Sequence, residues 1–260
     1  MRTLNWGAMY KTGRRPAVHT RRTMRSALAM ARALDPLGAP PAASADYVSA
    51  VMAASPGGWG MDLNDSLGDC VCADTAHQVM LHTANAGSII IPTDDQVLSL
   101  YEAVGGYVPG DSSTDNGCDE TSMCQYMETT GLAGQKSAGT GMIDPANLNH
   151  IKWAIQLFGA CRLGIFVDDG MVDQFQAGQP WTTPPTNPEG HDVPAVKFDV
   201  NYAYVVTWAG LQAVSWSLMA NASFLDEAHA EVYPDWVTAS GAAPSGFNLT
   251  QLLADLPSVA

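Results

Sequence analysis

Helical signals dominate the first half of the globular part of the chain. Leu148, Ile151 and Ile155 recur at the spacing of one helix face. Thr93 can cap a helix with its hydroxyl while Gln96 reaches back to the cap, which is the capping-box pattern. The predicted helices span residues 70–86, 94–104, 120–130 and 146–158.

The second half changes to short runs rich in β-branched and aromatic residues, which are typical of strands. Asn248 is placed to cap a last short helix over 249–256. A helical first lobe followed by a lobe rich in antiparallel strands predicts an α+β fold with a cleft between the lobes. The predicted strands span residues 163–169, 193–199, 203–210, 213–219 and 229–237.

The first 45 residues have a different character from the rest. Residues 17–34 predict a basic helix, and a linker rich in Pro and Ala follows it. We therefore expect an arm and linker over 1–45 and one globular domain over 46–260. The chain has 260 residues, of which 47% are hydrophobic, and this is enough to bury a full core.

Charge is divided unevenly between these two regions. Eight of the twelve basic residues lie in the first 32 positions, where there is no Asp or Glu. The rest of the chain contains four basic and 26 acidic residues, so its net charge is −22. A basic arm of this kind binds an acidic partner or is a solvated tail. The residues expected to bind a partner are Arg14, Arg15, Arg21, Arg22 and Arg25.

The cysteine count and the spacing of possible ligands argue against a disulfide framework and against a metal site. There are five cysteines and no apolar core of a secretory signal at the start, which favours reduced thiols. Neither cysteine pair has zinc-ligand spacing. The acidic run DSSTDNGCDE lacks the final Glu and the Gly spacing of a calcium loop. We expect no metal, no other cofactor and no membrane-spanning segment.

Cys70 is the strongest candidate for chemistry, because it opens the predicted helix over 70–86. The positive end of a helix dipole favours the thiolate form of a cysteine. The backbone N–H at the same position can stabilise an oxyanion, and the side-chain amide of Asn64 could supply a second donor. The alternative for an isolated cysteine is a small buried core residue.

Four segments, in order, resemble the motifs of papain-like cysteine peptidases. In WGMDLNDSLGDC, Asn64 resembles the family's oxyanion Gln, Gly68 the Gly before the nucleophile, and Cys70 the nucleophile. DNGCDETSMC resembles the family's Asn-x-Gly-Cys-x-Gly-Gly segment, with Cys118 in the Cys place. GHDVPAVKFD resembles the strand that carries the catalytic base, which places His191 in that role.

The fourth segment, YVVTWAG, resembles the strand with the family's Asn-Ser-Trp-Gly, and Trp208 matches its Trp. Val206 stands where the family has the Asn that orients the base, so Thr207 is the substitute candidate. Glu120 and Thr121 replace the Gly-Gly that keeps the groove open. The resemblance implies a substrate cleft formed by Gly68, Asp69, Cys118, Glu120, Gly190 and Trp208.

Two functions fit these residues. The first is a cysteine hydrolase that cleaves peptide, isopeptide or related amide bonds with a Cys70–His191 dyad. The second is a catalytically silent structural protein of a virion, a capsid or tail component docked by its basic arm. The chain also resembles compact papain-like proteins of bacteriophages and prophages, so we expect it in a bacterial cytoplasm or a virion. Nucleic-acid binding is disfavoured, because the acidic body would repel phosphates.

Overall fold

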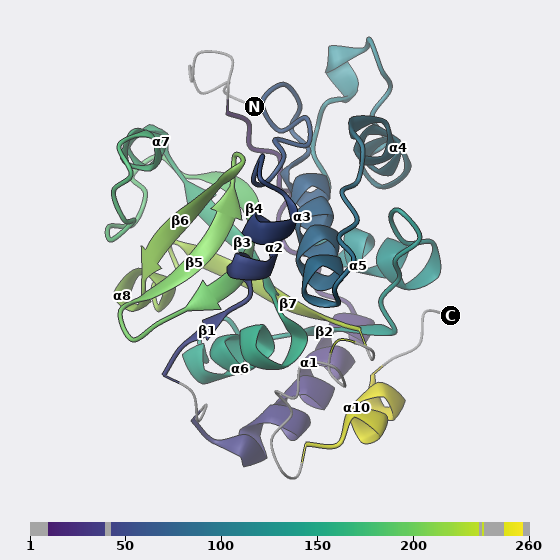
Figure 1. The fold of residues 1–260 in the computed structure, drawn as a ribbon, viewed down its shortest axis with the longest axis vertical. Coiled ribbons are helices and arrows are strands. Elements are labelled where there is room, and N and C mark those ends of the chain that lie inside the picture. The colour runs from purple at the N-terminus through teal and green to yellow at the C-terminus, as the bar shows by residue number, and fades with distance from the viewer. Residues whose placement is uncertain (1–9, 40–42, 234–235, 237–246, 257–260) are drawn as a thin grey trace.

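The computed structural model describes residues 10–39, 43–233, 236 and 247–256. It is an α+β structure in which one antiparallel sheet lies beside a group of helices, as Figure 1 shows. The sheet has the strand order β2-β7-β3-β4-β5-β6, and β1 pairs with β4 outside this path. This arrangement matches the expected fold class.

The edge strand β6 alternates between buried and more exposed residues, whereas β3 and β7 are buried at all but one position. Every pairing between them is antiparallel. Their bounds are β1 (Ala45–Asp46), β2 (Gly139–Met142), β3 (Cys161–Val167), β4 (Glu189–Phe198), β5 (Tyr202–Thr207), β6 (Gly210–Ser215) and β7 (Leu225–Val232).

The central helix α3 packs against β4, and its residues are buried over almost their whole length. Helices α4 and α5 cover the side of α3 away from the sheet (Figure 1). The helices are α1 (Arg21–Leu34), α2 (Val48–Ala54), α3 (Cys70–Asn85), α4 (Asp94–Gly105), α5 (Glu120–Thr129), α6 (Leu148–Phe158), α7 (Asp169–Gln176), α8 (Trp216–Met219) and α10 (Leu249–Asp255).

The predicted helix ends agree with the observed caps. The Thr93 hydroxyl accepts a hydrogen bond from the Gln96 backbone, and the Gln96 side chain accepts one from Thr93. Asn248 caps α10 as expected. Helix α6 begins at Leu148, two residues later than predicted, because the Asn147 side chain caps it.

Several short elements differ from the sequence prediction. Residues 216–219 form α8 rather than the end of a strand, because the Ser215 hydroxyl caps a helical turn there. Helices α2 and α7 and strands β1 and β2 were not predicted. The last positions of the strand expected over 229–237 fall at 234, 235 and 237, outside the described residues.

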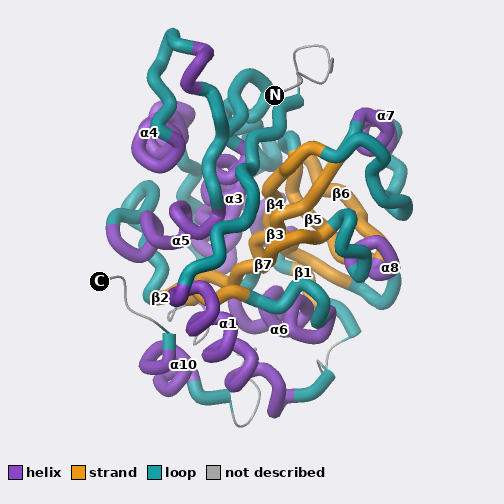
Figure 2. The backbone as a smooth tube through the Cα atoms, turned by 180° about the vertical axis from the view of Figure 1, so that it is seen from behind, coloured by secondary structure: helices purple, strands orange, loops and turns teal. Residues whose placement is uncertain are grey.

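The basic segment folds onto the domain rather than away from it. Figure 2 shows residues after position 9 running between the helices and the sheet before they enter α1. Within α1, Met30 and Leu34 are buried in the same apolar cluster as the sheet. The boundary at residue 45 stays a prediction, and the linker positions 40–42 lie outside the described residues. No described helix is long and apolar enough to cross a membrane.

A buried arginine joins the central helix to three strands. Arg162 on β3 is fully buried, and its guanidinium lies 2.7 Å from Asp192 on β4 and 2.8 Å from Glu231 on β7. The same guanidinium donates to the Thr75 hydroxyl of α3 and forms an ion pair with Asp74. Burial, followed by the charges of Glu120 and Asp74, raises the pKa of Asp192 well above its usual range.

We expect replacement of Arg162 to lower the free energy of unfolding strongly. The variant Arg162→Leu leaves buried carboxyl groups without their cation, which costs about 3–5 kcal/mol in the free energy of unfolding. Urea denaturation measures this loss. The control is Lys197→Ala, which breaks a partly exposed ion pair with Asp46 and costs less than about 1 kcal/mol. Equal losses in the two variants would contradict the role of Arg162.

Candidate active site

Cys70 is the first residue of α3, and its side chain faces β4. The residue is only 2% exposed. Burial raises the pKa of its thiol well above the usual value, and the charge of Asp192 raises it further. A hydrogen bond from the Asp192 backbone acts in the opposite direction but is the smaller effect. The sequence predicted a thiolate favoured by the helix end, whereas in this closed arrangement desolvation is stronger and keeps the thiol protonated.

His191 lies on β4, next to Asp192, and its ring is held on two sides. Its Nε2 atom is 2.8 Å from the Thr207 hydroxyl. Its ring stacks on Trp208 with a centroid distance of 4.8 Å and an interplanar angle of 20°. The Nδ1 atom is buried and has no hydrogen-bond partner among the described residues. Burial lowers the pKa of His191 to about 3, so the imidazole is neutral.

Trp208 is positioned by a strained turn between β5 and β6. Trp208 and Ala209 both have positive φ, 44° and 62°, where glycine or asparagine is usual. Backbone strain of this kind costs about 1–3 kcal/mol per residue and is concentrated at functional sites. The turn places Trp208 against His191, while Val206 packs in an apolar cluster with Trp59.

Cys70, His191 and Thr207 line one small cavity of about 10 Å³ between α3 and the sheet. A space of this size holds about one water molecule. Asn64 also lines it, but its Nδ2 atom donates to the Leu67 carbonyl and to the Asp69 carboxylate, each at 3.2 Å. A larger hollow of about 470 Å³ lies between α1 and α10 and shares no residue with this site.

The chain's own residues 11–15 lie between residues that the sequence placed in the substrate groove, and they bond to both sides of it. On one side, the Lys11 N–H donates to the Asn64 carbonyl, and the Trp208 indole donates to the Lys11 carbonyl. Further along, the Arg14 N–H donates to the Gly190 carbonyl at 3.2 Å. These bonds join the segment to the loop before α3 and to the strand that carries His191.

The opposite side of the segment contacts the predicted cleft residues of the helical lobe. The Arg15 N–H donates to the Cys118 carbonyl at 2.9 Å. Gly13 lies so close to Gly68 that a Cβ on Gly13 would be 1.8 Å from the Gly68 carbonyl oxygen. Gly117, with φ of 72°, also leaves no room for a side chain against Gly13. Only glycine fits at position 13.

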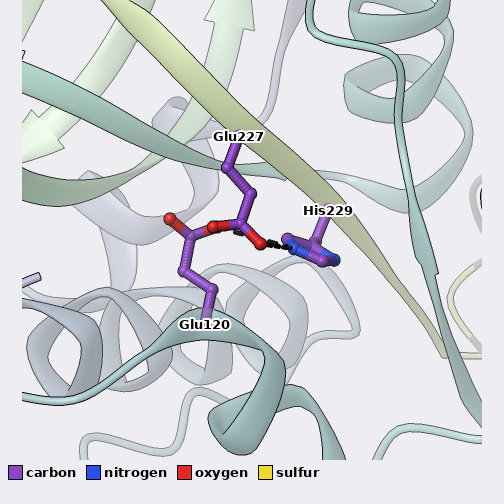
Figure 3. Close-up of side chains that lie close together, drawn as sticks. All are labelled: Glu120, Glu227 and His229. Carbon is purple, nitrogen blue, oxygen red and sulfur yellow. Dashed lines mark hydrogen bonds and ion pairs between the residues drawn. The ribbon is translucent and has the colours of Figure 1, made fainter. Parts of the chain in front are cut away.

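A second cluster of ionisable side chains, which the sequence analysis did not find, surrounds Arg14. Glu120 of α5 faces Glu227 and His229 of β7, as Figure 3 shows. The three residues are buried, and one ligand atom from each lies within 4.8 Å of the others, so they could hold a metal ion. The signal in the sequence is the alternation Glu227, His229, Glu231, which places three polar groups on one face if these residues form a strand.

The basic residues expected to contact a partner mostly contact this chain. Arg14 is buried among carboxylates, and Arg15 donates to the carbonyls of Asn116 and Gly105. Arg22 forms an ion pair with Glu128 at 2.6 Å. Arg21 and Arg25 are exposed. Three of the five arginines are thus engaged within the chain, Arg14 and Arg22 by carboxylates and Arg15 by backbone carbonyls. The binding of a partner by these arginines stays a prediction.

The structure also places the cysteines and the other cleft residues that were predicted from the sequence. All five cysteines are unpaired and buried. Asp69, placed in the cleft by sequence, is buried at the head of α3, and burial raises its pKa well above the usual range. Thr121 is buried on α5 and donates to the Val18 carbonyl. The cleft residues that contact segment 11–15 directly are Gly68, Cys118, Glu120, Gly190 and Trp208.

The fold is shared with solved cysteine proteases. Xylellain, a cysteine protease from Xylella fastidiosa, matches with a TM-score of 0.60 and 14% identity over 86% of this chain and 97% of its own. Digestive procathepsin L 3 of Tenebrio molitor matches with a TM-score of 0.56 and 14% identity, over 87% of this chain and 76% of its own.

The cysteine protease and lectin-like domains of Cwp84 from Clostridium difficile match with a TM-score of 0.55 and 11% identity, over 86% of this chain and 62% of that one. No protein-family model matches the sequence, and no curated protein matches it. At these identities the likeness establishes the fold. The chain has the papain-like cysteine protease fold, as its ordered motifs predicted.

A larger side chain at position 13 is expected to open the groove, because Gly13 lies against Gly68. Gly13→Ala places a methyl group inside the contact distance of Gly68 and displaces segment 11–15. We expect trypsin to cleave after Lys11 and Arg14 on the order of tenfold faster than in the wild type, because local opening exposes these bonds. Mass spectrometry of timed digests measures the rates. Gly57→Ala, whose methyl group meets open space, is the control and should leave them unchanged.

The buried neutral His191 predicts a pH-dependent stability. Between about pH 3 and about pH 6.5 the unfolded chain binds a proton at this site and the folded chain does not. The free energy of unfolding therefore falls as pH decreases through this range, by up to about 1.4 kcal/mol per pH unit from this residue. Urea denaturation at several pH values should show a shallower dependence for His191→Gln. Parallel curves for the two proteins would rule out this contribution.

Proposed function

We propose that this protein is a papain-like cysteine hydrolase that cleaves peptide, isopeptide or related amide bonds with Cys70 and His191. The observation that carries the proposal is the pairing of these residues across one cavity. The Thr207 hydroxyl forms a hydrogen bond with Nε2 of His191, whereas Nδ1 has no hydrogen-bond partner among the described residues. A base held in this way has one orienting contact and one nitrogen available for the thiol.

The proposed reaction begins when a substrate replaces segment 11–15 in the groove. The Cys70 thiol transfers its proton to His191 Nδ1, and the thiolate attacks the carbonyl carbon of the scissile amide. The Cys70 N–H stabilises the resulting oxyanion. The Asn64 amide can donate a second hydrogen bond to the oxyanion once its bonds to the Leu67 carbonyl and the Asp69 carboxylate break. The C–N bond then breaks, and the leaving amine takes the proton from His191. Water, deprotonated by His191, hydrolyses the thioester and regenerates the thiol.

The closed arrangement holds both reacting groups in their uncharged forms. Burial raises the pKa of Cys70 and lowers that of His191, so proton transfer between them is unfavourable while the groove is filled. Hydration of an opened groove would remove this penalty and restore the effect of the helix end on the thiol. The wild-type chain is therefore proposed to be latent.

Selective labelling of Cys70 tests this proposal. A chloroacetamide probe at neutral pH should modify Cys70 in Gly13→Ala on the order of tenfold faster than in the wild type, because the thiol becomes accessible and hydrated. Cys72, which is buried deeper in α3, should not react. Peptide mapping by mass spectrometry identifies the modified residue.

Hydrolysis of a fluorogenic peptide library by Gly13→Ala supplies the second readout. Adding Cys70→Ala should abolish the activity, on the order of 10⁴-fold or more, and His191→Ala should have a similar effect. Thr207→Val should reduce the rate by about tenfold, because it removes only the orienting contact. Full hydrolysis by a variant that lacks Cys70 would refute the mechanism.

A second candidate function is a silent structural protein on the same fold, such as a capsid or tail component of a virion. The filled groove favours it, since residues 11–15 bond to both walls. Its expected docking surface would consist of the exposed Arg21 and Arg25 rather than the whole arm. Failure of Gly13→Ala both to react with the probe and to hydrolyse peptides would favour this reading over the hydrolase.

A further inference from the structure

The side chain of Arg14 fills a buried acidic pocket. Its Nε atom donates to Glu120 at 2.8 Å, and its Nη2 atom donates to Asp226 at 2.5 Å and lies 3.4 Å from Glu227. The arginine side chain is only 1% exposed. Its guanidinium carbon also lies 5.7 Å from the centre of the Phe166 ring, a cation–π contact. The pocket therefore offers carboxylates to the charge and the N–H groups of a guanidinium, and an aromatic ring to its flat face.

The walls of this pocket are built by elements other than the segment that fills it. Glu120 comes from α5 and Glu227 from β7, as Figure 3 shows. Asp226 is also a residue of β7. His229 holds Glu227 with a bond of 2.7 Å between Nε2 and Oε1. Gly164 of β3 forms the floor, where a Cβ would lie 2.2 Å from both Arg14 Nε and Glu120 Oε1. A glycine at this position leaves the space that the guanidinium occupies.

Arg14 does not use all the acceptors of the pocket. The Oε2 atom of Glu120 is buried and has no hydrogen-bond partner among the described residues. Burial and the nearby charge of Glu227 raise the pKa of Glu120. Burial opposes ionisation of Glu227 too, but its hydrogen bond from His229 and the charges of His229 and Arg14 lower its pKa overall. Three carboxyl groups converge on one guanidinium, and this arrangement favours a cation in the pocket.

The pocket opens onto the groove beside the candidate dyad. The Arg14 N–H donates to the carbonyl of Gly190, the residue before His191. Gly13 contacts Gly68, which is two residues before Cys70. A chain that lies in this groove thus delivers one side chain into the acidic pocket while its neighbouring backbone passes the reacting residues.

We propose that the pocket formed by Glu120, Asp226, Glu227 and Gly164 is a side-chain subsite that selects an arginine residue of a peptide substrate, and that Arg14 is its internal occupant. The substrate part of this inference rests on the proposed hydrolase function. The binding part does not require turnover. A guanidinium is favoured over an ammonium, because separate nitrogens of one planar group reach carboxylates from different elements.

Ligand binding to full-length Arg14→Ala tests the subsite directly. The probe is N-acetyl-arginine amide, compared with its lysine counterpart and with the citrulline analogue, which has the same shape and no charge. Isothermal calorimetry should show one saturable site for the arginine probe with a dissociation constant of about 1 mM or tighter. The lysine probe should bind on the order of tenfold more weakly, and the citrulline probe should not bind.

Further variants separate the subsite from the catalytic proposal. Adding Glu120→Gln should weaken binding of the arginine probe on the order of tenfold, and adding Cys70→Ala should leave it unchanged. If the probe binds but no variant hydrolyses peptides, the subsite stands and the hydrolase proposal fails. If peptides are hydrolysed without preference for arginine, the hydrolase stands and the subsite fails.

Three results would overturn the subsite. One is the absence of saturable binding, and another is equal binding of arginine and citrulline probes. The third is tight binding of Zn²⁺ to Arg14→Ala without binding of the arginine probe, which would assign Glu120, Glu227 and His229 to a metal instead. If Arg14→Ala does not fold alone, its refolding yield with the arginine probe should exceed that with the lysine and citrulline probes. Equal yields would also overturn the proposal.

Discussion

The ion network of Arg162 holds the two halves of this molecule in register. One guanidinium, shielded from solvent, contacts α3 through Asp74 and Thr75, β4 through Asp192 and β7 through Glu231. Asp74 lies one helical turn after Cys70, and Asp192 follows His191, so the relative position of the thiol and the imidazole depends on this contact. A buried charge tolerates little displacement, because every partner that it loses leaves an unpaired charge in a medium of low polarity.

The second buried arginine, Arg14, is also surrounded by carboxylates from other parts of the chain. Arg14 brings the basic segment into an acidic pocket, and the contacts of Gly13, Gly68 and Gly117 let the backbones approach without side chains between them. The strong negative charge of the body is therefore not only a surface property. Part of it lies inside the molecule, where it is matched by cations from the first 32 residues of the chain and from β3.

Cys70 and His191, the proposed reacting groups, line one cavity, but burial disfavours their charged forms. Thr207 and Trp208 fix the His191 ring, and the strained turn at Trp208 and Ala209 shows that this placement is maintained at a cost in backbone energy. The same packing desolvates Cys70 and His191 and keeps both neutral. In the proposed mechanism, the filled groove keeps Cys70 and His191 in place but uncharged, and opening of the groove would hydrate them.

The sequence by itself predicted the main helices, most of the strands and the fold, because capping residues, periodicity and ordered motifs are local signals. It also proposed the pair Cys70 and His191, which line one cavity in the structure. Thr207 was named as a substitute for the missing Asn, but only the pairing of β5 with β4 brings its hydroxyl to His191. The tertiary structure alone placed segment 11–15 in the groove and gathered Glu120, Asp226 and Glu227 around Arg14. Those contacts join residues about a hundred or more positions apart, and a net charge does not reveal which charges are buried together.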